Sequence, residues 1–273
     1  DAGRELSLNR AEKAAHTFVV WPESAITPRI FDSLQKPTLM SDVLESFGGD
    51  AYLISGIMRR DFDGRETVYY NSLFVLNERD EIPHVYDKHH LVPFGEYIPF
   101  SSVVNIAPLV QFIGLRSGPG PAVISPDTAP AFMPLICYEG IFPNITMPLD
   151  NQDISWLVNV TNDAWYGVSA GPHQHLKQVS FRSIEQGLPL ARSANTGISA
   201  IVDPYGRILE DIPYNTSGQI SSFLPQSAST PTVYSQYGNI IFGLMIIAVC
   251  LPFLVNMIQR YRVKPPFPKF LKQ

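Results

Sequence analysis

The stretch Ala131–Ile136 (AFMPLI) is an unbroken apolar run that ends directly before Cys137. A short continuous run of this kind is typical of a strand buried on both faces. Similar runs recur at Thr17–Trp21, Ala51–Ile57, Val68–Leu76, Ile154–Val160, Leu190–Ala194, Ile198–Asp203 and Arg207–Ile212. Helical candidates lie between some of them, at Thr38–Phe47 and at His173–Gln186, the second with Leu176, Val179 and Ile184 on its expected inner face. Interleaved strands and helices predict a layered α/β domain.

Composition limits the classes of function. The 273 residues carry a formal net charge of −5, from 25 acidic and 20 basic side chains, which excludes a nucleic-acid-binding protein that depends on bulk positive charge. Hydrophobic residues make up 45% of the chain and charged residues 16%, so part of the apolar surface is expected to face something other than water. Because only two cysteines occur, Cys137 and Cys250, no disulfide framework is expected.

The excess apolarity is concentrated near the C-terminus. Ile240–Ile258 contains no charged side chain, and Asn256 is its one strongly polar residue. At about 1.5 Å per residue the stretch would cover roughly 28 Å, close to the ~30 Å of a bilayer's hydrocarbon core. We expect a transmembrane helix and not a buried core helix, since soluble helices are rarely apolar on every face. The residues after it include Arg260, Arg262, Lys264, Lys269 and Lys272 and no acidic residue, which marks the cytoplasmic side and places the rest of the chain opposite.

Three reactive side chains follow apolar runs, at the positions where α/β sheets carry their sites. Glu23 follows the run Thr17–Trp21, Lys88 follows Ile82–Tyr86, and Cys137 follows Ala131–Ile136. Taken alone, the glutamate is usually a solvated turn residue and the cysteine a packing residue. Together they supply a nucleophile, a base and a cation, which are the groups that acyl transfer through sulfur requires.

The roles follow from the chemistry of the groups. Glu23 would accept the thiol proton of Cys137, and the Lys88 ammonium would favour the thiolate and hold the oxyanion. The backbone N–H of Tyr138 is the natural second oxyanion donor. Glu96 and Glu139 are candidates for positioning the lysine and the incoming nucleophile.

Several motifs occur in one order: WPE at 21–23, YDKHHLVPFGEYIP at 86–99, ICYE at 136–139, TNDAWYG at 161–167, PHQH at 172–175 and NTG at 195–197. They resemble those of the nitrilase (carbon–nitrogen hydrolase) superfamily, and most closely its membrane branch, the apolipoprotein N-acyltransferases. The resemblance implies a Glu-Lys-Cys triad in this chain order, and it adds Asn162 and Trp165 to the supporting residues.

The resemblance also implies a nitrilase-like αββα sandwich followed by one C-terminal transmembrane helix. Residues 1–233 would form the catalytic domain, and residues 234–273 the linker end, the helix at about 240–258 and a basic cytoplasmic tail. The family's domain opens with a strand, whereas residues 1–16 contain only a polar helical stretch. We therefore expect the first strand, and the bundle of membrane helices that precedes the domain in the family, to lie outside this chain.

The implied reaction is N-acylation of the diacylglyceryl-cysteine at the N-terminus of an apolipoprotein. A phospholipid donates the acyl group through a thioester on Cys137, without metal, cofactor or nucleic acid. The implied location is the bacterial inner membrane, with the domain facing the periplasm. Trp165, Tyr166 and Phe142 are candidates for the acyl-chain entrance, with core packing as the alternative, and Ser101–Ser117 for a loop that dips into lipid.

Other interpretations of the sequence stay open at this point. A membrane-anchored amidase of the same superfamily, acting on small amides, would carry the same three residues, and a catalytically silent binding module would keep the fold alone. Gly167–Gly171 matches the G-x-S-x-G pattern of serine hydrolases, but no histidine follows His175, as that fold requires. The pairs His89–His90 and His173–His175 lack the spaced pattern of a zinc site.

Overall fold

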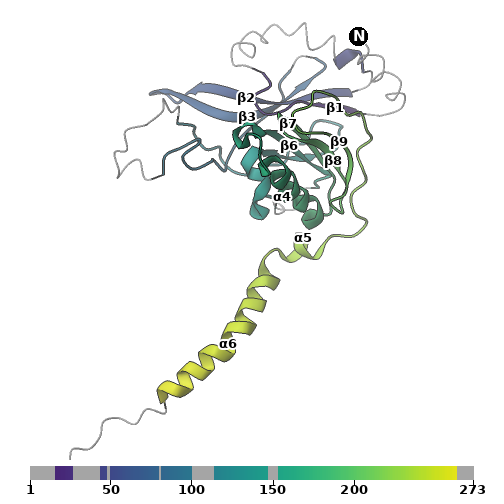
Figure 1. Ribbon diagram of the computed structural model, residues 1–273. Coiled ribbons are helices and arrows are strands. Elements are labelled where there is room, and N and C mark those ends of the chain that lie inside the picture. Colours follow the sequence, from purple (N-terminus) through teal and green to yellow (C-terminus); the bar gives the residue numbers. More distant parts are fainter. Residues whose placement is uncertain are drawn as a thin grey trace, which may run out of the picture.

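Two β-sheets form the centre of the molecule (Figure 1). The computed structural model describes residues 16–26, 44–47, 50–79, 81–99, 114–146 and 153–262. The first sheet has the order β1-β2-β3-β4, with strands at His16–Val20, Asp50–Phe62, Thr67–Asn77 and His84–Asp87. The second has the order β5-β6-β7-β8-β9, with strands at Phe132–Ile136, Trp156–Asn162, Leu190–Asn195, Ser199–Val202 and Ile208–Ile212. The predicted mixed α/β fold is confirmed.

Strand direction brings the reactive residues to matching edges of the sheets. β1 is parallel to β2, and two antiparallel pairings in succession make β4 parallel to β1. β5, β6 and β7 are parallel to one another. Glu23 and Lys88 therefore follow carboxyl ends of the first sheet, and Cys137 follows a carboxyl end of the second.

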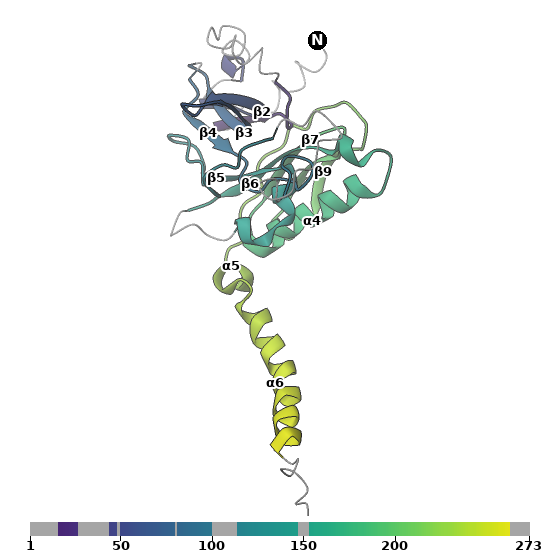
Figure 2. The same cartoon turned by 90° about the vertical axis from the view of Figure 1, so that its left-hand side faces the viewer.

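The pleat of each strand separates two apolar layers, because successive side chains point to opposite faces. Tyr52 and Ile54 of β2 pack against Phe132 and Ile136 of β5 between the sheets. The residues between them in sequence point outward. Met133 and Leu135, for example, pack under α4, a helix at Gly171–Gln186 that covers the far face of the second sheet (Figure 2).

The helix α4 differs in detail from the prediction. It begins at Gly171, two residues earlier than expected, and ends at Gln186 as predicted. Gly187 follows, and its φ of 68° is the left-handed conformation that closes many helices. Leu176 and Val179 are buried as predicted, but Ile184 is 41% exposed and the inner face continues through Ser183. Positions that follow one another by three and four residues lie on the same face of a helix, and this spacing leads from Leu176 and Val179 to Ser183. Ile184 is one position further and therefore lies beside that face.

Three further expectations concern single segments. β6 continues to Asn162, two residues past the end of the predicted run Ile154–Val160. Of the predicted helix Thr38–Phe47, residues 38–43 lie outside the described residues. Most of the predicted lipid-dipping loop Ser101–Ser117 also lies outside them.

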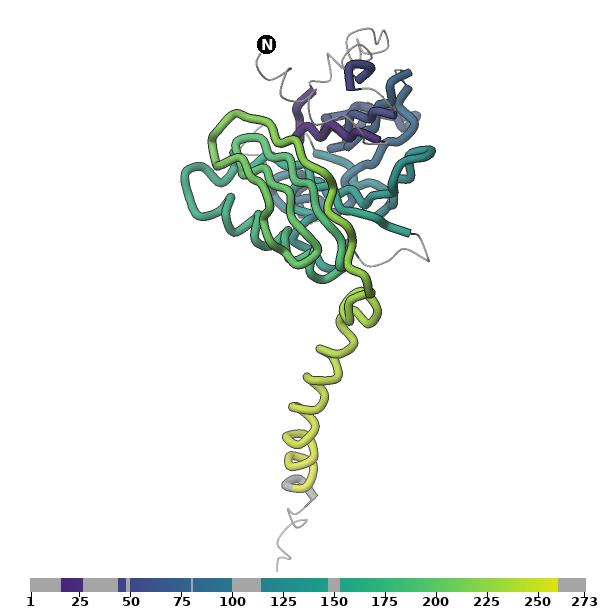
Figure 3. Tube along the Cα trace, turned by 90° about the vertical axis from the view of Figure 1, so that its right-hand side faces the viewer, coloured from purple at the N-terminus to yellow at the C-terminus, as the bar shows by residue number. Residues whose placement is uncertain are grey.

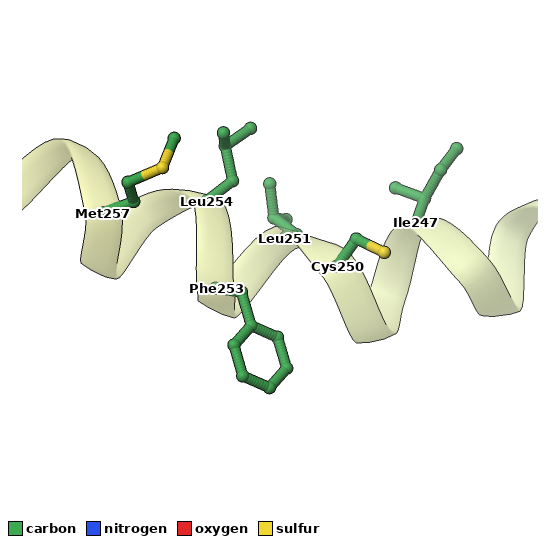
Figure 4. Close-up of a pocket in the computed structure, with 6 residues that line it drawn as sticks. All are labelled: Ile247, Cys250, Leu251, Phe253, Leu254 and Met257. Atoms are coloured by element: carbon green, nitrogen blue, oxygen red, sulfur yellow. The ribbon is translucent and has the colours of Figure 1, made fainter.

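The C-terminal helix α6, at Ile240–Arg262, projects away from the sheets (Figures 1 and 3). Its segment Ile240–Gln259 has a mean hydropathy of 2.6 and no buried part, so it is long and apolar enough to cross a membrane. Figure 4 shows Ile247 and Leu254 on one side of the helix and Phe253 on the other. Apolar side chains on opposite sides are typical of a helix that lipid surrounds.

The segment before α6 is attached to the sheets. In the Pro- and Ser-rich segment Pro225–Pro231, the Ser227 hydroxyl donates to the carbonyl of Ser155 at 2.9 Å, and the Ala228 N–H donates to the carbonyl of Gly187 at 2.8 Å. The short helix α5, at Val233–Tyr237, follows and is capped by Thr232, whose hydroxyl accepts from the Ser235 N–H at 2.9 Å. These contacts connect the base of α6 to the domain.

Phe132 tests the packing between the sheets. Its ring is fully buried, and the ring centroid lies 5.2 Å from that of Trp156 and 6.4 Å from that of Phe18. Replacing Phe132 with alanine should lower the free energy of unfolding by about 3–5 kcal/mol, because it leaves a cavity among aromatic rings. Thermal unfolding followed by tryptophan fluorescence measures the loss. The control is Val168→Ala, at a residue that is 97% exposed, and an equal shift in both variants would contradict the packing described.

Candidate active site

Glu23 lies in the turn after β1 and connects the two sheets. Its Oε1 accepts from Asn71 Nδ2 at 2.6 Å, and its Oε2 accepts from the backbone N–H of Asn162 at 2.6 Å. The turn lies so close to β2 that a Cβ on Gly56 would come within 2.6 Å of the Glu23 Cα. Both carboxylate oxygens are therefore held in place, one by each sheet.

Lys88 follows β4 directly and is 1% exposed. Its Nζ donates to Oε1 of Glu96 at 2.8 Å, and the second oxygen of Glu96 accepts from the Val92 N–H at 2.8 Å. Burial lowers the pKa of Lys88, but the charge of Cys137 once it is ionised and the carboxylates of Glu96 and Glu23 outweigh it and hold the pKa above its ordinary value. The ammonium is therefore retained in a buried position.

Cys137 is the first residue of the 3₁₀ helix η1, at Cys137–Ile141, which follows β5. Burial raises the pKa of its thiol to about 11, and the Glu23 carboxylate adds to the rise. The Lys88 ammonium, the Thr161 hydroxyl and the Asn162 N–H oppose it. At neutral pH the resting cysteine is therefore a thiol, with a proton acceptor and a cation both close by.

The structure thus brings together the three residues that the sequence analysis singled out. Glu23, Lys88 and Cys137 come from three different strand ends, and their charges act on one another directly. Glu96 contacts the lysine, as expected. A carboxylate, an ammonium and a thiol in one buried place can exchange a proton and stabilise an oxyanion.

Glu139 has a different surrounding from the one expected. Its carboxylate is fully buried and accepts from the Tyr86 hydroxyl at 2.8 Å and from the N–H groups of His89, His90 and Ile136 at 2.8, 3.1 and 2.8 Å. Four donors occupy its oxygens, so it holds the backbone beside Lys88 and Cys137 instead of facing an incoming nucleophile. Its short distance from Cys137 in sequence favoured the other interpretation.

Aromatic side chains follow Cys137 in the chain and also follow β6. The Tyr138 and Phe142 rings meet edge to face at 4.8 Å, and Phe142 also packs on His90 at 3.9 Å. Burial, together with the charges of His89 and Lys88, lowers the pKa of His90. Trp165 is 86% exposed on η3, the 3₁₀ helix Asp163–Tyr166 that follows β6.

Asn71 is a site residue that the sequence analysis missed. Its Nδ2 donates to Glu23, and also to Glu96 at 3.1 Å, so one amide group orients both carboxylates. Its backbone carbonyl accepts from the Lys88 N–H at 2.8 Å. The available signal was a polar residue inside the apolar run Val68–Leu76.

The rival signals have ordinary structural surroundings. Ser169 of the G-x-S-x-G match lies in a turn before α4, where its hydroxyl donates to the carbonyl of Tyr166 at 2.8 Å, and η3 separates it from the strand β6. Among the residues that the structure describes, no group of three or more His, Cys, Asp and Glu side chains is arranged to hold a metal ion.

Comparison with known proteins identifies the family and the fold. The carbon–nitrogen hydrolase family model matches residues 4–232. The chain belongs to the carbon–nitrogen hydrolase family. A crystal structure of a carbon–nitrogen hydrolase from Helicobacter pylori G27 has a TM-score of 0.54 at 17% identity, over 77% of this chain and 76% of that one. The nitrilase-like fold predicted from the motifs is therefore confirmed.

Relatives of this carbon–nitrogen hydrolase chain carry a more specific name. The apolipoprotein N-acyltransferase of Rhodopseudomonas palustris is 37% identical over 257 residues, which are 92% of this chain and 46% of the relative. That of Brucella melitensis is 41% identical over 213 residues, 76% of this chain and 39% of the relative. The chain spans less than half the length of these relatives.

The charges at the site predict how readily Cys137 reacts with iodoacetamide. Glu23→Gln removes a charge that raises the thiol pKa, so the alkylation rate at pH 8 should rise; Lys88→Met removes a charge that lowers the pKa, so the rate should fall. Each unit of pKa change alters the thiolate fraction about tenfold. Both variants are made with Cys250→Ala, so that one thiol remains, and the rate is measured by mass spectrometry. A slower reaction in Glu23→Gln would contradict the stated effect of that charge.

Proposed function

We propose that this chain is the catalytic part of an apolipoprotein N-acyltransferase, which moves an acyl group from a phospholipid to a lipoprotein through Cys137. The observation that carries the proposal is the convergence of Glu23, Lys88 and Cys137 in one buried site. A helix apolar enough to cross a membrane, in the same chain, favours substrates that reside in lipid. The names of the relatives support the same activity.

In the first step the Cys137 thiol gives its proton to Glu23 while the sulfur attacks the carbonyl carbon of the phospholipid sn-1 ester. The negative charge that forms on the carbonyl oxygen is held by the Lys88 ammonium and the backbone N–H of Tyr138. When the C–O bond breaks, the proton on Glu23 passes to the leaving oxygen. Lysophospholipid departs and the acyl group remains as a thioester.

In the second step the α-amine of the diacylglyceryl-cysteine attacks the thioester. A C–N bond forms and the C–S bond breaks. Glu23 accepts a proton from the amine and passes it to the departing thiolate, which restores the thiol and the free carboxylate. A thioester suits this exchange because amines displace it more readily than they displace an ester. Lys88 stays protonated throughout, which agrees with its retained charge.

The surrounding residues would prepare this chemistry. Asn71 and Glu96 hold the base and the ammonium before substrate arrives. Glu139 fixes the backbone directly before the thiol, and the Asn162 N–H holds the Glu23 carboxylate. Preorganised groups of this kind need little rearrangement as charge develops.

The membrane side of the proposal rests on α6. With its basic C-terminal end in the cytoplasm, the domain would lie on the periplasmic face of the inner membrane, where lipoproteins are presented. The exposed ring of Trp165, together with the neighbouring Tyr166, would meet the acyl chains at the entrance. Phospholipid and diacylated apolipoprotein are then the two substrates.

The nucleophile is tested by intact-protein mass spectrometry. The full-length protein, incubated with phospholipid vesicles, should gain one acyl mass on Cys137. Cys137→Ala should show no adduct, and transfer to a diacylated lipopeptide should fall by at least about 10³-fold, as for other covalent nucleophiles. Cys250→Ala is the matched control and should keep both activities, because that thiol lies on α6.

Two results would reject the proposal. Hydrolysis of small amides without transfer to the lipopeptide would assign the site to an amidase. Absence of an acyl adduct in the unmodified protein, with no amide hydrolysis, would favour a silent binding module.

Trp165→Ala tests the acyl-chain entrance. Removing an exposed indole that contacts lipid should raise the KM for phospholipid about tenfold, while alkylation of Cys137 stays unchanged. The control is Tyr205→Ala, since Tyr205 is 64% exposed but follows β8, at the edge of the sheet opposite Cys137. Equal effects of both substitutions, or none of either, would contradict an entrance at Trp165.

A further inference from the structure

A buried polar cluster lies directly behind Cys137. It consists of Asp163 on η3, His175 on α4 and Arg192 on β7, and all three side chains are almost completely buried. None of them belongs to the Glu-Lys-Cys set. Burying three charged or polar side chains costs free energy unless each of them is paired. Their hydrogen-bond partners therefore indicate which part of the site the cluster supports.

His175 is the member that contacts the reacting residue. Its Nε2 lies 3.2 Å from the backbone carbonyl oxygen of Cys137, and its Nδ1 lies 2.9 Å from Oδ1 of Asp163. The Tyr166 ring packs beside the imidazole at 5.7 Å. The hydrogen bond of the histidine with Cys137 is therefore made to the main chain of that residue.

The partners of His175 determine where its protons lie. A backbone carbonyl can only accept, so Nε2 must donate to it. Oδ2 of Asp163 accepts from Arg192 at 2.6 Å, and Oδ1 also accepts from the Thr161 hydroxyl at 3.1 Å. Burial raises the pKa of Asp163, but the His175 hydrogen bond and the Arg192 charge outweigh it and hold the pKa below its usual range.

Nδ1 of His175 has two partners on its other side. Asp163 Oδ1 lies 2.9 Å away and can accept from it, and Arg192 Nη2 lies 3.3 Å away and can donate to it. Asp163 and Arg192 therefore orient the ring from behind, and Nε2–H is directed toward Cys137.

The backbone of Cys137 needs such support. Its φ of 50° is in the left-handed region, which residues other than glycine seldom occupy. Residues are held in this region only when surrounding contacts determine it, and they are often found at functional sites. The carbonyl that His175 holds belongs to this same residue.

We propose that His175 is a positioning residue for Cys137: its Nε2–H holds the Cys137 carbonyl, and so keeps the left-handed backbone that directs the thiol toward Glu23 and Lys88. Asp163 and Arg192 orient the imidazole ring from behind. The inference rests on the proposed function only in taking Cys137 as the residue that reacts.

Two substitutions separate this role from simple packing. The amide nitrogen of glutamine can occupy the place of Nε2, and that of asparagine the place of Nδ1. His175→Gln keeps a donor for the Cys137 carbonyl, whereas His175→Asn keeps a donor only for Asp163. If the carbonyl contact positions the thiol, alkylation of Cys137 by iodoacetamide should fall at least about tenfold in His175→Asn and less than about threefold in His175→Gln.

The measurements use the full-length protein in lipid nanodiscs with Cys250→Ala, and thermal unfolding verifies that both variants fold. Equal alkylation rates in the two variants, or a slower rate in His175→Gln, would overturn the proposal. Acyl transfer should follow the same ranking. If the alkylation ranking holds while no variant transfers acyl groups, the proposed function fails and the positioning role stands.

A measurement on the unsubstituted protein tests the donor itself. With ¹⁵N-labelled histidine, Nε2 of His175 should give the chemical shift and coupling of a protonated nitrogen, because the Cys137 carbonyl can only accept. The signals are assigned by their loss in His175→Gln. An Nε2 without a bound proton would overturn the inference.

Discussion

The buried carboxylate of Glu139 is the interaction on which the geometry of the site depends. It accepts from Tyr86, His89 and His90, which belong to the first sheet and the loop after it, and from Ile136 at the end of β5. A buried carboxylate is costly unless donors surround it, and here donors from both sheets do so. The ends of β4 and β5 are thereby held together, which brings Lys88 beside Cys137.

Charge balance explains how the other ionisable groups of the site can be buried together. Lys88 lies among Glu23, Glu96 and the thiol of Cys137, and the uncharged amide of Asn71 separates the two carboxylates by donating to both. A second set, His175, Asp163 and Arg192, lies behind the thiol. One set would move the proton and the other would hold the backbone. Their different tasks explain why one protein contains two buried clusters.

Several features of this arrangement were predictable from local sequence. The apolar runs at Thr17–Trp21 and Ala131–Ile136 form strands because a continuous run of that length suits a buried sheet, and Ile240–Ile258 forms a helix apolar on opposite sides. The local pattern predicts less well which of two neighbouring residues is buried or where a strand ends. The pattern predicted that Ile184 faces inward on α4 and that the strand β6 ends before Thr161. In the structure Ser183 faces inward instead, and β6 continues to Asn162.

The sequence by itself determined which reactive groups follow which strands, and that one segment has the length and apolarity to cross a membrane, because both depend on the identity of neighbouring residues. Only the tertiary structure decided the partners of those groups. Glu23 meets Asn162 across 139 positions of the chain and Asn71 across 48, and His175 meets the Cys137 carbonyl across 38. Hydrogen bonds between residues so far apart depend on how the sheets pack, and no local pattern of side chains encodes that packing.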